Sequence, residues 1–320
     1  MGATELGWQC CRLLLQMGQN VVGIFSIPEQ FQISWSASPL RNVRYRSFAD
    51  LANTYHIELT YVTEKMSASR YYDVLKRLAP DIIIVVGWYY IIPRKLRGIA
   101  PLGVVGIHAS LLPKYRGASP LVWAVINGET EAGASLFYLE DGIDTGGVVA
   151  QERFSIAPDD AILDVIKKST QAALKMLHEY VPKLADGTAP HVPQNDADAT
   201  YVPPRTPEDG YLSWWEKSAV QAYHWVRAQT RPYPGAFTYF NGERLMLWRA
   251  RPAERTSLLV SGSLTASTHP DAFSVVCSDH DLLDILEVST HSGDSMSGAE
   301  WFRAQAARGI PLVFGEQSHT

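Results

Sequence analysis

The chain has little cysteine, and its few cysteines are poorly spaced for disulfide or metal sites. Cys10, Cys11 and Cys277 are the only cysteines in 320 residues. Two adjacent cysteines and a distant third give neither an even disulfide framework nor a metal-ligand spacing. We therefore expect reduced thiols in a cytoplasmic protein, and no metal.

The chain also lacks a basic cluster, a membrane-spanning run and a signal peptide. The chain has 28 Lys plus Arg and 33 Asp plus Glu, which gives a net charge of −5. This balance argues against a broad positively charged surface that binds nucleic acid. The most apolar run, 82–92, stops at Pro93 and is too short to span a bilayer. No basic segment leads into an apolar one at the N-terminus. We expect neither nucleic acid nor membrane as a partner.

Helical and apolar β-rich segments alternate through the first 187 residues. The clearest buried strand is 81–86, and a long amphipathic helix is expected at 161–184. Further strands are predicted at 21–27, 59–62, 104–107, 134–138 and 148–154, further helices at 5–17, 47–55, 69–78 and 121–126, and a loop at 28–42. This alternation predicts an α/β fold with a Rossmann-like, doubly wound parallel sheet that binds ligands beyond the carboxyl ends of its strands.

No strand precedes the first predicted helix. A doubly wound domain normally opens with a strand, but this chain passes almost directly from Met1 into the helix at 5–17. Either the sheet lacks this strand or the given start omits some residues. The sequence leaves both alternatives open.

The composition changes near residue 188. Residues 188–204, rich in Pro, Asn, Asp and Thr, are predicted to form a linker. The linker separates a catalytic domain at 1–187, whose opening strand is missing or absent, from a second domain at 205–320.

The second domain is rich in aromatic residues and short β-like runs. Runs 236–240 and 244–248, joined by Asn241 and Gly242, have the pattern of a hairpin. With a helix at 218–228, these runs predict a smaller, OB-like β-barrel domain, in which the aromatic side chains form the core.

Two polar loops near the middle of the chain carry candidate catalytic residues. His108 stands at the carboxyl end of the strand predicted at 104–107, and Asp144 lies in the tight loop 141–147. A carboxylate can orient an imidazole so that the ring donates to an oxyanion or moves a proton. A purely structural hydrogen bond is the alternative, and these residues alone leave it open.

Together the loops resemble the folate-dependent formyltransferases. The resemblance lies in Ser110-Leu-Leu-Pro-Lys-Tyr-Arg-Gly117, Asn127-Gly-Glu129 and Asp141-Gly-Ile-Asp-Thr-Gly146, and it spans about residues 1–185. The family includes methionyl-tRNA formyltransferase, glycinamide ribonucleotide formyltransferase and the sugar N-formyltransferases. The resemblance implies a Rossmann-like transferase that takes a one-carbon group from 10-formyltetrahydrofolate.

The resemblance also implies site residues. His108 and Asp144 fall on the family's catalytic His and Asp, which stabilise the oxyanion and help to remove the proton of the attacking amine. The implied folate-binding residues are Gly87, Trp88, Tyr89, Tyr90, Ile91, Leu139, Asp141 and Gly142. The implied substrate-binding residues are Ser110, Leu112, Lys114, Tyr115, Arg116, Gly117 and Arg231, of which Lys114, Arg116 and Arg231 are candidate phosphate partners.

Gly106 departs from the family's Asn-x-His motif. A glycine has no side-chain donor, and losing one oxyanion donor typically costs about 3–4 kcal/mol. Three interpretations follow. The protein is a slow formyltransferase with a water or backbone N–H in the gap, it handles another one-carbon group or a bulkier acceptor that needs the room, or it is catalytically silent.

The second domain bears on the acceptor. Arg205-Thr-Pro-Glu-Asp-Gly210, Trp214 and Pro232-Tyr-Pro-Gly-Ala-Phe237 resemble sugar N-formyltransferases, above all aminoarabinose formyltransferase. A tRNA-binding barrel should be basic, whereas 205–320 holds 10 Lys plus Arg against 13 Asp plus Glu. We expect a nucleotide-linked amino sugar or a similar small amine as acceptor, with methionyl-tRNA formyltransferase as an alternative, and a homodimer.

Other functions are also considered. A formyltransferase fold that binds folate or nucleotide without transfer is supported by Gly106 but opposed by the intact His108 and Asp144. A hydrolase that releases formate is disfavoured by the sugar-type second domain. No G-x-G-x-x-G follows a strand, which argues against an NAD-dependent dehydrogenase.

Overall fold

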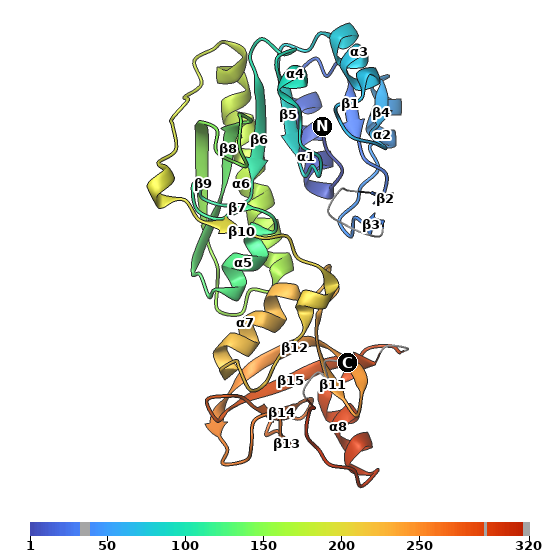
Figure 1. Cartoon of the computed structure of the whole chain (residues 1–320), viewed down its shortest axis with the longest axis vertical. Helices are drawn as coiled ribbons and strands as arrows, with labels where there is room; N and C mark the ends of the chain where they lie inside the picture. Colours follow the sequence, from blue (N-terminus) through green and yellow to red (C-terminus); the bar gives the residue numbers. More distant parts are fainter. Residues whose placement is uncertain (33–38, 291–292, 316–320) are drawn as a thin grey trace. The chain divides into compact units, whose positions relative to one another are not determined.

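The computed structural model describes residues 1–32, 39–290 and 293–315 (Figure 1). The chain forms two compact units. The N-terminal unit contains Met1–Pro120, Glu131–Ser155 and Lys167–Val202. The C-terminal unit contains Leu121–Thr130, Ile156–Ile166 and Pro203–Thr320. The domain limits at residues 187 and 205 stay predictions, but most of the predicted linker belongs to the N-terminal unit.

The N-terminal unit alternates helices and strands, as predicted. Its helices are α1 (Glu5–Gln16), α2 (Ala49–Thr54), α3 (Ser69–Leu78), α4 (Arg94–Arg97) and most of α6 (Ile162–Ala185). Its strands are β1 (Ile24–Ser26), β2 (Gln30–Phe31), β3 (Leu40–Arg41), β4 (Leu59–Tyr61), β5 (Ile83–Val86), β6 (Val104–His108), β7 (Arg116–Gly117), β8 (Glu131–Tyr138), β9 (Val148–Ser155) and β10 (Tyr201–Val202). The loop predicted at 28–42 contains the β2–β3 pair, and its residues 33–38 lie outside the described residues.

The main sheet is mixed rather than parallel throughout. Strands β5, β6, β8 and β9 lie side by side in that order, and β1 pairs with β4 separately (Figure 1). The β1–β4 and β5–β6 pairs are parallel, whereas β8 runs antiparallel to both β6 and β9. A short loop, 139–147, joins β8 to β9, and a short connection allows only antiparallel pairing. The alternation of strands and helices did not reveal this hairpin.

Apolar side chains cover both faces of this sheet, which confirms the α/β, Rossmann-like fold. Helices α3 and α4 bury Tyr71, Leu75 and Leu96 against Ile83 and Val85 on one face. On the other face, α1 and α6 contribute Cys10, Met176 and Leu177, which pack with Val105 and Leu136. Burying each large aliphatic side chain contributes roughly 1.5–3 kcal/mol. In the ranges that the structure describes, no helix is long and apolar enough to cross a bilayer.

The C-terminal unit is built on an antiparallel sheet. Its helices are α5 (Pro120–Ile126), α7 (Ala219–Gln229) and α8 (Gly298–Ala306). Its strands are β11 (Ala236–Phe240), β12 (Glu243–Thr256), β13 (Leu264–Ala266), β14 (Phe273–Val276), β15 (Asp281–Thr290) and β16 (Met296–Ser297). The sheet has the order β11-β12-β15-β14-β13, with β16 paired to β15. Asn241 and Gly242 both have positive φ, which confirms the predicted hairpin turn between β11 and β12.

The last described residues connect the two edges of this sheet. The amide of Leu264 donates to Leu312 (2.9 Å) and that of Phe314 to Gly262 (3.0 Å), while Gly315 donates to Tyr239 in β11 (3.3 Å). The segment thus links the β13 edge to the β11 edge, in the manner of the predicted barrel-like domain. The aromatic side chains form the core, as predicted: Trp214, Phe240, Phe273, Trp301 and Phe314 are all buried.

Candidate active site

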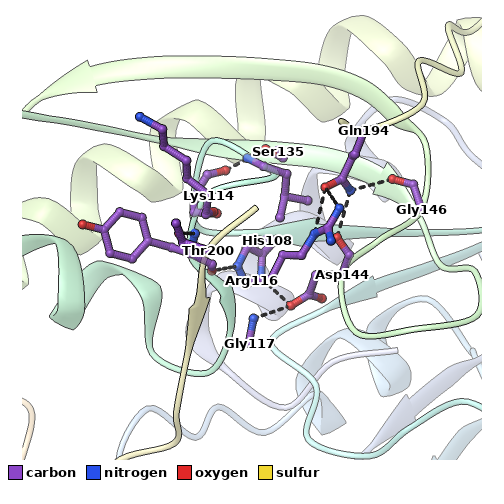
Figure 2. A network of polar contacts seen from close by, with 12 residues as sticks. His108, Lys114, Arg116, Gly117, Ser135, Asp144, Gly146, Gln194 and Thr200 are labelled. Carbon is purple, nitrogen blue, oxygen red and sulfur yellow. Dashed lines mark hydrogen bonds and ion pairs between the residues drawn. The ribbon is translucent and has the colours of Figure 1, made fainter. Parts of the chain in front are cut away.

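His108 and Asp144 lie together beyond the carboxyl end of β6 (Figure 2). The distance from His108 Nδ1 to Asp144 Oδ2 is 3.5 Å, an ion-pair distance that is longer than a direct hydrogen bond. His108 Nε2 lies 2.7 Å from the carbonyl oxygen of Tyr115, and His108 is only 8% exposed. Both ring nitrogens therefore face oxygen acceptors, and only a doubly protonated ring can donate at both positions.

Several hydrogen bonds fix the Asp144 loop. The carboxylate accepts from the amide of Gly117 at 2.9 Å. The Gln194 side-chain amide donates to the carbonyls of Asp144 (2.8 Å) and Gly146 (2.7 Å). Asp144 itself has a φ of 55°, a conformation that costs energy for a residue other than glycine. The loop therefore holds the carboxylate beside the imidazole before any ligand binds.

Gly117 is a position where only glycine fits. Its φ is 108°, and a β-carbon there would stand 2.4 Å from the carbonyl oxygen of Val202. This close approach comes from the parallel pairing of β7 with β10. The pairing places the amide of Gly117 against Asp144, so the backbone conformation of Gly117 and the position of the Asp144 carboxylate are coupled.

Arg116 is buried, with 1% exposure, and forms the centre of a polar network. Its guanidinium donates to Gln194 Oε1 (3.1 and 2.8 Å), to Asp196 (2.8 Å) and to the hydroxyl of Tyr201 (2.9 Å). Burial disfavours the charge, but hydrogen bonds to Asp196 and Tyr201 raise the pKa of Arg116 above its usual value. A phosphate could bind Arg116 only by displacing these partners, so the side chain holds the loop instead.

The other residues predicted from the 110–117 loop have different environments. Ser110 and Leu112 are buried, and the Ser110 hydroxyl donates to the carbonyl of Lys114 at 2.6 Å. Tyr115 has a φ of 58°, and its amide donates to Thr200 Oγ1 at 2.8 Å. Lys114 is exposed. Lys114 is thus the loop cation that solvent and solutes can reach.

Arg231 belongs to the C-terminal unit. Its guanidinium donates to Glu287 (2.8 Å) and to Ser295 (2.6 Å), and it lies 4.0 Å from the centre of the Trp248 ring. The 110–117 loop belongs to the N-terminal unit. The predicted contact of Arg231 with phosphate stays a prediction.

The predicted folate-binding loop follows β5 and is largely aromatic. Gly87 has a φ of 61°, and the rings of Trp88 and Tyr90 lie 6.2 Å apart. The hydroxyls of Tyr89 and Tyr90 donate to Asn42 Oδ1 and to the carbonyl of Gln32, both at 3.0 Å. The buried indole N–H of Trp88 has no hydrogen-bond partner within the described residues, an unmet donor beside flat rings. These features fit a planar heterocycle with acceptor atoms, such as a pterin.

Arg97 joins this loop to the loop after β8. Its guanidinium donates to the carbonyls of Ile92 (3.5 Å) and Glu140 (2.8 Å) and forms an ion pair with Asp141. The Arg97 side chain is only 16% exposed, whereas Arg94, 3.9 Å from the same carboxylate, is 87% exposed. Sequence reasoning did not identify Arg97. Of the predicted folate-binding residues, Ile91 is 84% exposed and Gly142 lies in a turn with a φ of 105°.

The space beside Gly106 is filled. A β-carbon on Gly106 would stand 2.6 Å from Leu139 Cδ1 and 3.4 Å from Phe137 Cε1. Leu139 is itself held by a hydrogen bond from its amide to Val104 (2.8 Å). The missing side chain therefore leaves no vacant room here, and the interpretation in which Gly106 admits a bulkier acceptor has no support in this geometry.

Sequence reasoning also missed residues within the predicted linker 188–204. Gln194, Asp196, Thr200 and Tyr201 all bond to the Arg116 and Tyr115 region. The segment looked like a linker because it lacks apolar periodicity, and its role depends on partners about 80 residues away. Elsewhere in the described ranges, no three His, Cys, Asp or Glu side chains gather as a metal site would require.

Two family models match the chain. One, described as formyl transferase, matches residues 32–181, and the other, described as formyl transferase, C-terminal domain, matches residues 205–306. This chain belongs to the formyltransferase family. The predicted family and fold are thereby confirmed.

Solved structures with the same fold include both sugar and tRNA formyltransferases. The N-formyltransferase from Helicobacter canadensis, in complex with folinic acid and dTDP-3-aminofucose, has a TM-score of 0.65 at 15% identity, over 89% of this chain and 96% of its own. The methionyl-tRNA formyltransferase from Clostridium thermocellum has a TM-score of 0.50 at 21% identity, over 72% and 93%.

A third relative is much longer than this formyltransferase. HypX from Aquifex aeolicus, in complex with tetrahydrofolic acid, has a TM-score of 0.59 at 18% identity, over 82% of this chain. The match covers only 45% of HypX, so this chain spans about half of its length. At these identities the three likenesses describe the fold.

Proposed function

We propose that this formyltransferase moves a formyl group from 10-formyltetrahydrofolate to the amine of a nucleotide-linked amino sugar or a similar small amine. The observation that carries this proposal is the pair formed by His108 and Asp144, 3.5 Å apart at the end of β6. An oriented imidazole beside a fixed carboxylate suits acyl transfer to an amine, because the ring can stabilise an oxyanion and the carboxylate can accept a proton.

The folate-binding loop supports the choice of donor. Trp88 and Tyr90 offer aromatic faces and an unmet N–H donor, and Arg97 fixes Glu140 and Asp141 beside them. These residues would hold the pterin, and the donor, once bound, supplies the formyl carbon. Membership of the formyltransferase family supports the same donor.

The catalytic pair has two tasks in this reaction. His108 would hold a proton against the formyl oxygen as that oxygen gains negative charge, which requires its Nε2 to exchange the Tyr115 carbonyl for the new acceptor. The Asp144 carboxylate, fixed by the amide of Gly117, would take the proton that the amine loses when the new C–N bond forms. Collapse of the oxyanion would then break the bond between the formyl carbon and N10 of the folate, and N10 would take up that proton so that tetrahydrofolate leaves.

The charge distribution supports a small anionic acceptor. Residues 205–320 hold 10 Lys plus Arg against 13 Asp plus Glu, which disfavours tRNA. Lys114 is an exposed cation in the loop that also holds His108, so it is placed to meet a phosphate. We extend the proposal to a cytoplasmic homodimer that binds neither nucleic acid nor membrane.

A second candidate is a formyltransferase-fold protein that binds folate but transfers slowly or not at all. Gly106 and the apolar Leu139 beside it favour this candidate, because a leucine side chain stands where the family has a donor. Loss of one such donor typically lowers kcat by about a hundredfold to a thousandfold.

A turnover assay separates the two candidates. The purified chain is incubated with 10-formyltetrahydrofolate and a panel of amino-sugar nucleotides, and products are read by mass spectrometry. A product heavier by one formyl group that is lost in His108→Ala, but kept in the exposed-helix control His178→Ala, supports the transferase. Tight folate binding by calorimetry without any product supports the binding protein.

A further inference from the structure

Two cations of the C-terminal unit share one tryptophan ring. The guanidinium of Arg205 lies 5.0 Å from the centre of the Trp225 ring, and the amino group of Lys217 lies 4.2 Å from the same centre. Arg205 also lies 4.9 Å from the centre of the Trp123 ring. Each ring face attracts a cation, but two positive charges in one neighbourhood repel each other. The arrangement therefore concentrates positive charge beside Trp225.

Hydrogen bonds hold the two rings and part of the Arg205 guanidinium in place. The indole N–H groups of Trp123 and Trp225 each donate to a backbone carbonyl, at 3.0 and 3.3 Å. Arg205 Nη2 donates to the carbonyl of Asp209 and to Gln229 Oε1, both at 2.6 Å. Within the described residues, Nε and Nη1 of Arg205 have no hydrogen-bond or ion-pair partner. The guanidinium is thus fixed while two of its nitrogens keep unused donors.

The amino group of Lys217 also lacks a partner in the part of the chain that the structure describes. Its backbone is fixed, because the amide of Ser278 donates to the Lys217 carbonyl at 3.1 Å. Burial lowers the pKa of Lys217, the neighbouring Glu216 opposes this shift, and the charge of Arg205 adds to it. Burial also lowers the pKa of Arg205. Both cations have therefore lost water without gaining a bonded anion.

The carboxylates around these cations are bonded to backbone amides or exposed. Asp209 Oδ2 accepts from the amide of Thr206 at 2.5 Å. The Asp279 carboxylate accepts from the amide of Ala219, with 3.2 Å to each oxygen. Glu216 is exposed and forms no ion pair with Lys217 among the described residues. None of the three provides the oxygen atoms that the free donors of the two cations require.

Another cation of the same unit shows the usual arrangement. Arg231 lies 4.0 Å from the centre of the Trp248 ring, and it also donates to Glu287 at 2.8 Å. Carboxylates are plentiful in this unit, because residues 205–320 hold 13 Asp plus Glu against 10 Lys plus Arg. Half-buried cations that keep unused donors in an acidic unit are suited to an anion from outside the chain.

We propose that Arg205 and Lys217 form a binding site for a phosphate or diphosphate group on the C-terminal unit. A fixed guanidinium directs its donors at phosphate oxygens, and a lysine amino group adds a point charge that can follow them. A nucleotide and a free anion present the same oxygens, so either source fits. The site contains neither His108 nor Asp144 and does not depend on formyl transfer, so it goes beyond the proposed function.

Calorimetry of the full chain with inorganic pyrophosphate, UDP and uridine tests the proposal. We expect saturable binding of pyrophosphate and UDP, and no binding of uridine. Arg205→Gln and Lys217→Gln each remove one charge, and we expect each to weaken binding by about tenfold or more. Arg244→Gln is the matched control, because Arg244 also lies over an aromatic ring of this unit, 3.8 Å from the centre of Phe237. We expect this control to change the affinity less than twofold.

The same titrations identify the source of the anion. Tighter binding of UDP than of pyrophosphate would assign the phosphate group to a nucleotide, and equal affinities would assign it to a free anion. Because turnover is not measured, a chain that transfers no formyl group still tests the site.

Three results would overturn the proposal. The first is the absence of saturable binding by both pyrophosphate and UDP. The second is binding that neither Arg205→Gln nor Lys217→Gln weakens, because the anion would then occupy another cation such as Lys114. The third is equal weakening in Arg244→Gln, which would indicate a general effect of charge. If Arg205→Gln does not fold, Lys217→Gln decides the outcome, since the Lys217 side chain forms no hydrogen bond with the described residues.

Discussion

Leu139 Cδ1 lies 2.6 Å from the point where a β-carbon on Gly106 would stand. The two residues therefore act as a pair, since a side chain at one position requires a smaller or displaced side chain at the other. An asparagine at residue 106 would restore the donor that the family carries there, but only if Leu139 gives way.

We expect Gly106→Asn combined with Leu139→Ala to raise kcat by about tenfold or more, because the double change adds a donor and provides its space. Gly106→Asn alone should instead cost about 1–3 kcal/mol of unfolding free energy through overpacking. Leu139→Ala alone is the control for lost apolar packing. The measurements are kcat by mass spectrometry and thermal unfolding. Equal kcat in the double variant and the parent would contradict the role assigned to residue 106.

Gln194→Ala should lower kcat by roughly tenfold to a hundredfold with little change in KM. The side chain holds the carbonyls of Asp144 and Gly146 and accepts from Arg116, so its loss frees the carboxylate loop and leaves buried donors unpaired. Gln171→Ala on the exposed side of α6 is the matched control. An unchanged kcat in Gln194→Ala would show that the carboxylate does not need this support.

Arg97→Ala should raise KM for the formyl donor by about tenfold while kcat changes little. Arg97 holds the carbonyls of Ile92 and Glu140 together, and separating them disorders the proposed pterin site before chemistry begins. Arg94→Ala removes an exposed cation near the same carboxylate and should change KM less than twofold. Similar increases in KM in the two variants would instead indicate a general effect of removing positive charge.

Gly117→Ala should destabilise the chain by about 2–4 kcal/mol and abolish most turnover. The new β-carbon would collide with the Val202 carbonyl and push the Gly117 amide away from Asp144. Gly18 also has a positive φ (73°), but a β-carbon there would meet no atom within 4 Å. Gly18→Ala should therefore lower the free energy of unfolding by only about 1 kcal/mol. Chemical denaturation measures both, and similar costs would mean that the collision is relieved elsewhere.

The free energy of unfolding should rise between about pH 6 and pH 8. The pKa of the Met1 amino group is about 6 in the folded chain, and its ordinary value is 8.0. In this window the unfolded chain binds more protons, so stability increases with pH by at most about 3 kcal/mol. The neighbouring thiols, Cys10 and Cys11, have pKa values raised by burial and stay neutral there. Acetylation of Met1 should reduce the slope, which denaturation at several pH values would show.

The sequence predicted best where periodicity is local. The helix expected at 161–184 matches α6 (Ile162–Ala185), and the Asn241-Gly242 turn joins β11 to β12. A segment with a strong apolar periodicity or a typical turn sequence is compatible with few local conformations. The antiparallel direction of β8 was missed because strand direction depends on pairing partners, which periodicity does not encode.

The site was predicted in part for a similar reason. The loop motifs identified His108 and Asp144, which lie 3.5 Å apart. Because β8 is antiparallel to β6, the end of β8 lies beside Val105, and the loop after β8 brings Asp144 back to His108. Sequence reasoning did not identify Arg97 and Gln194 as site residues. Each donates to backbone carbonyls of distant residues, and a sequence motif does not mark such carbonyls. Arg116 was predicted to contact a phosphate because the sequence alone does not distinguish a buried arginine from an exposed one.

The pairing of β10 with β7 makes the 110–117 loop depend on the segment that follows residue 187. Tyr115 donates to Thr200 and Arg116 donates to Tyr201, and both acceptors follow the predicted domain limit at 187. Protease cleavage between 187 and 194, in an otherwise folded protein, would loosen a segment that helps to hold the 110–117 loop in place. Sensitivity of turnover to a single cleavage there, more than 40 residues along the chain from Asp144, follows from this short parallel pair.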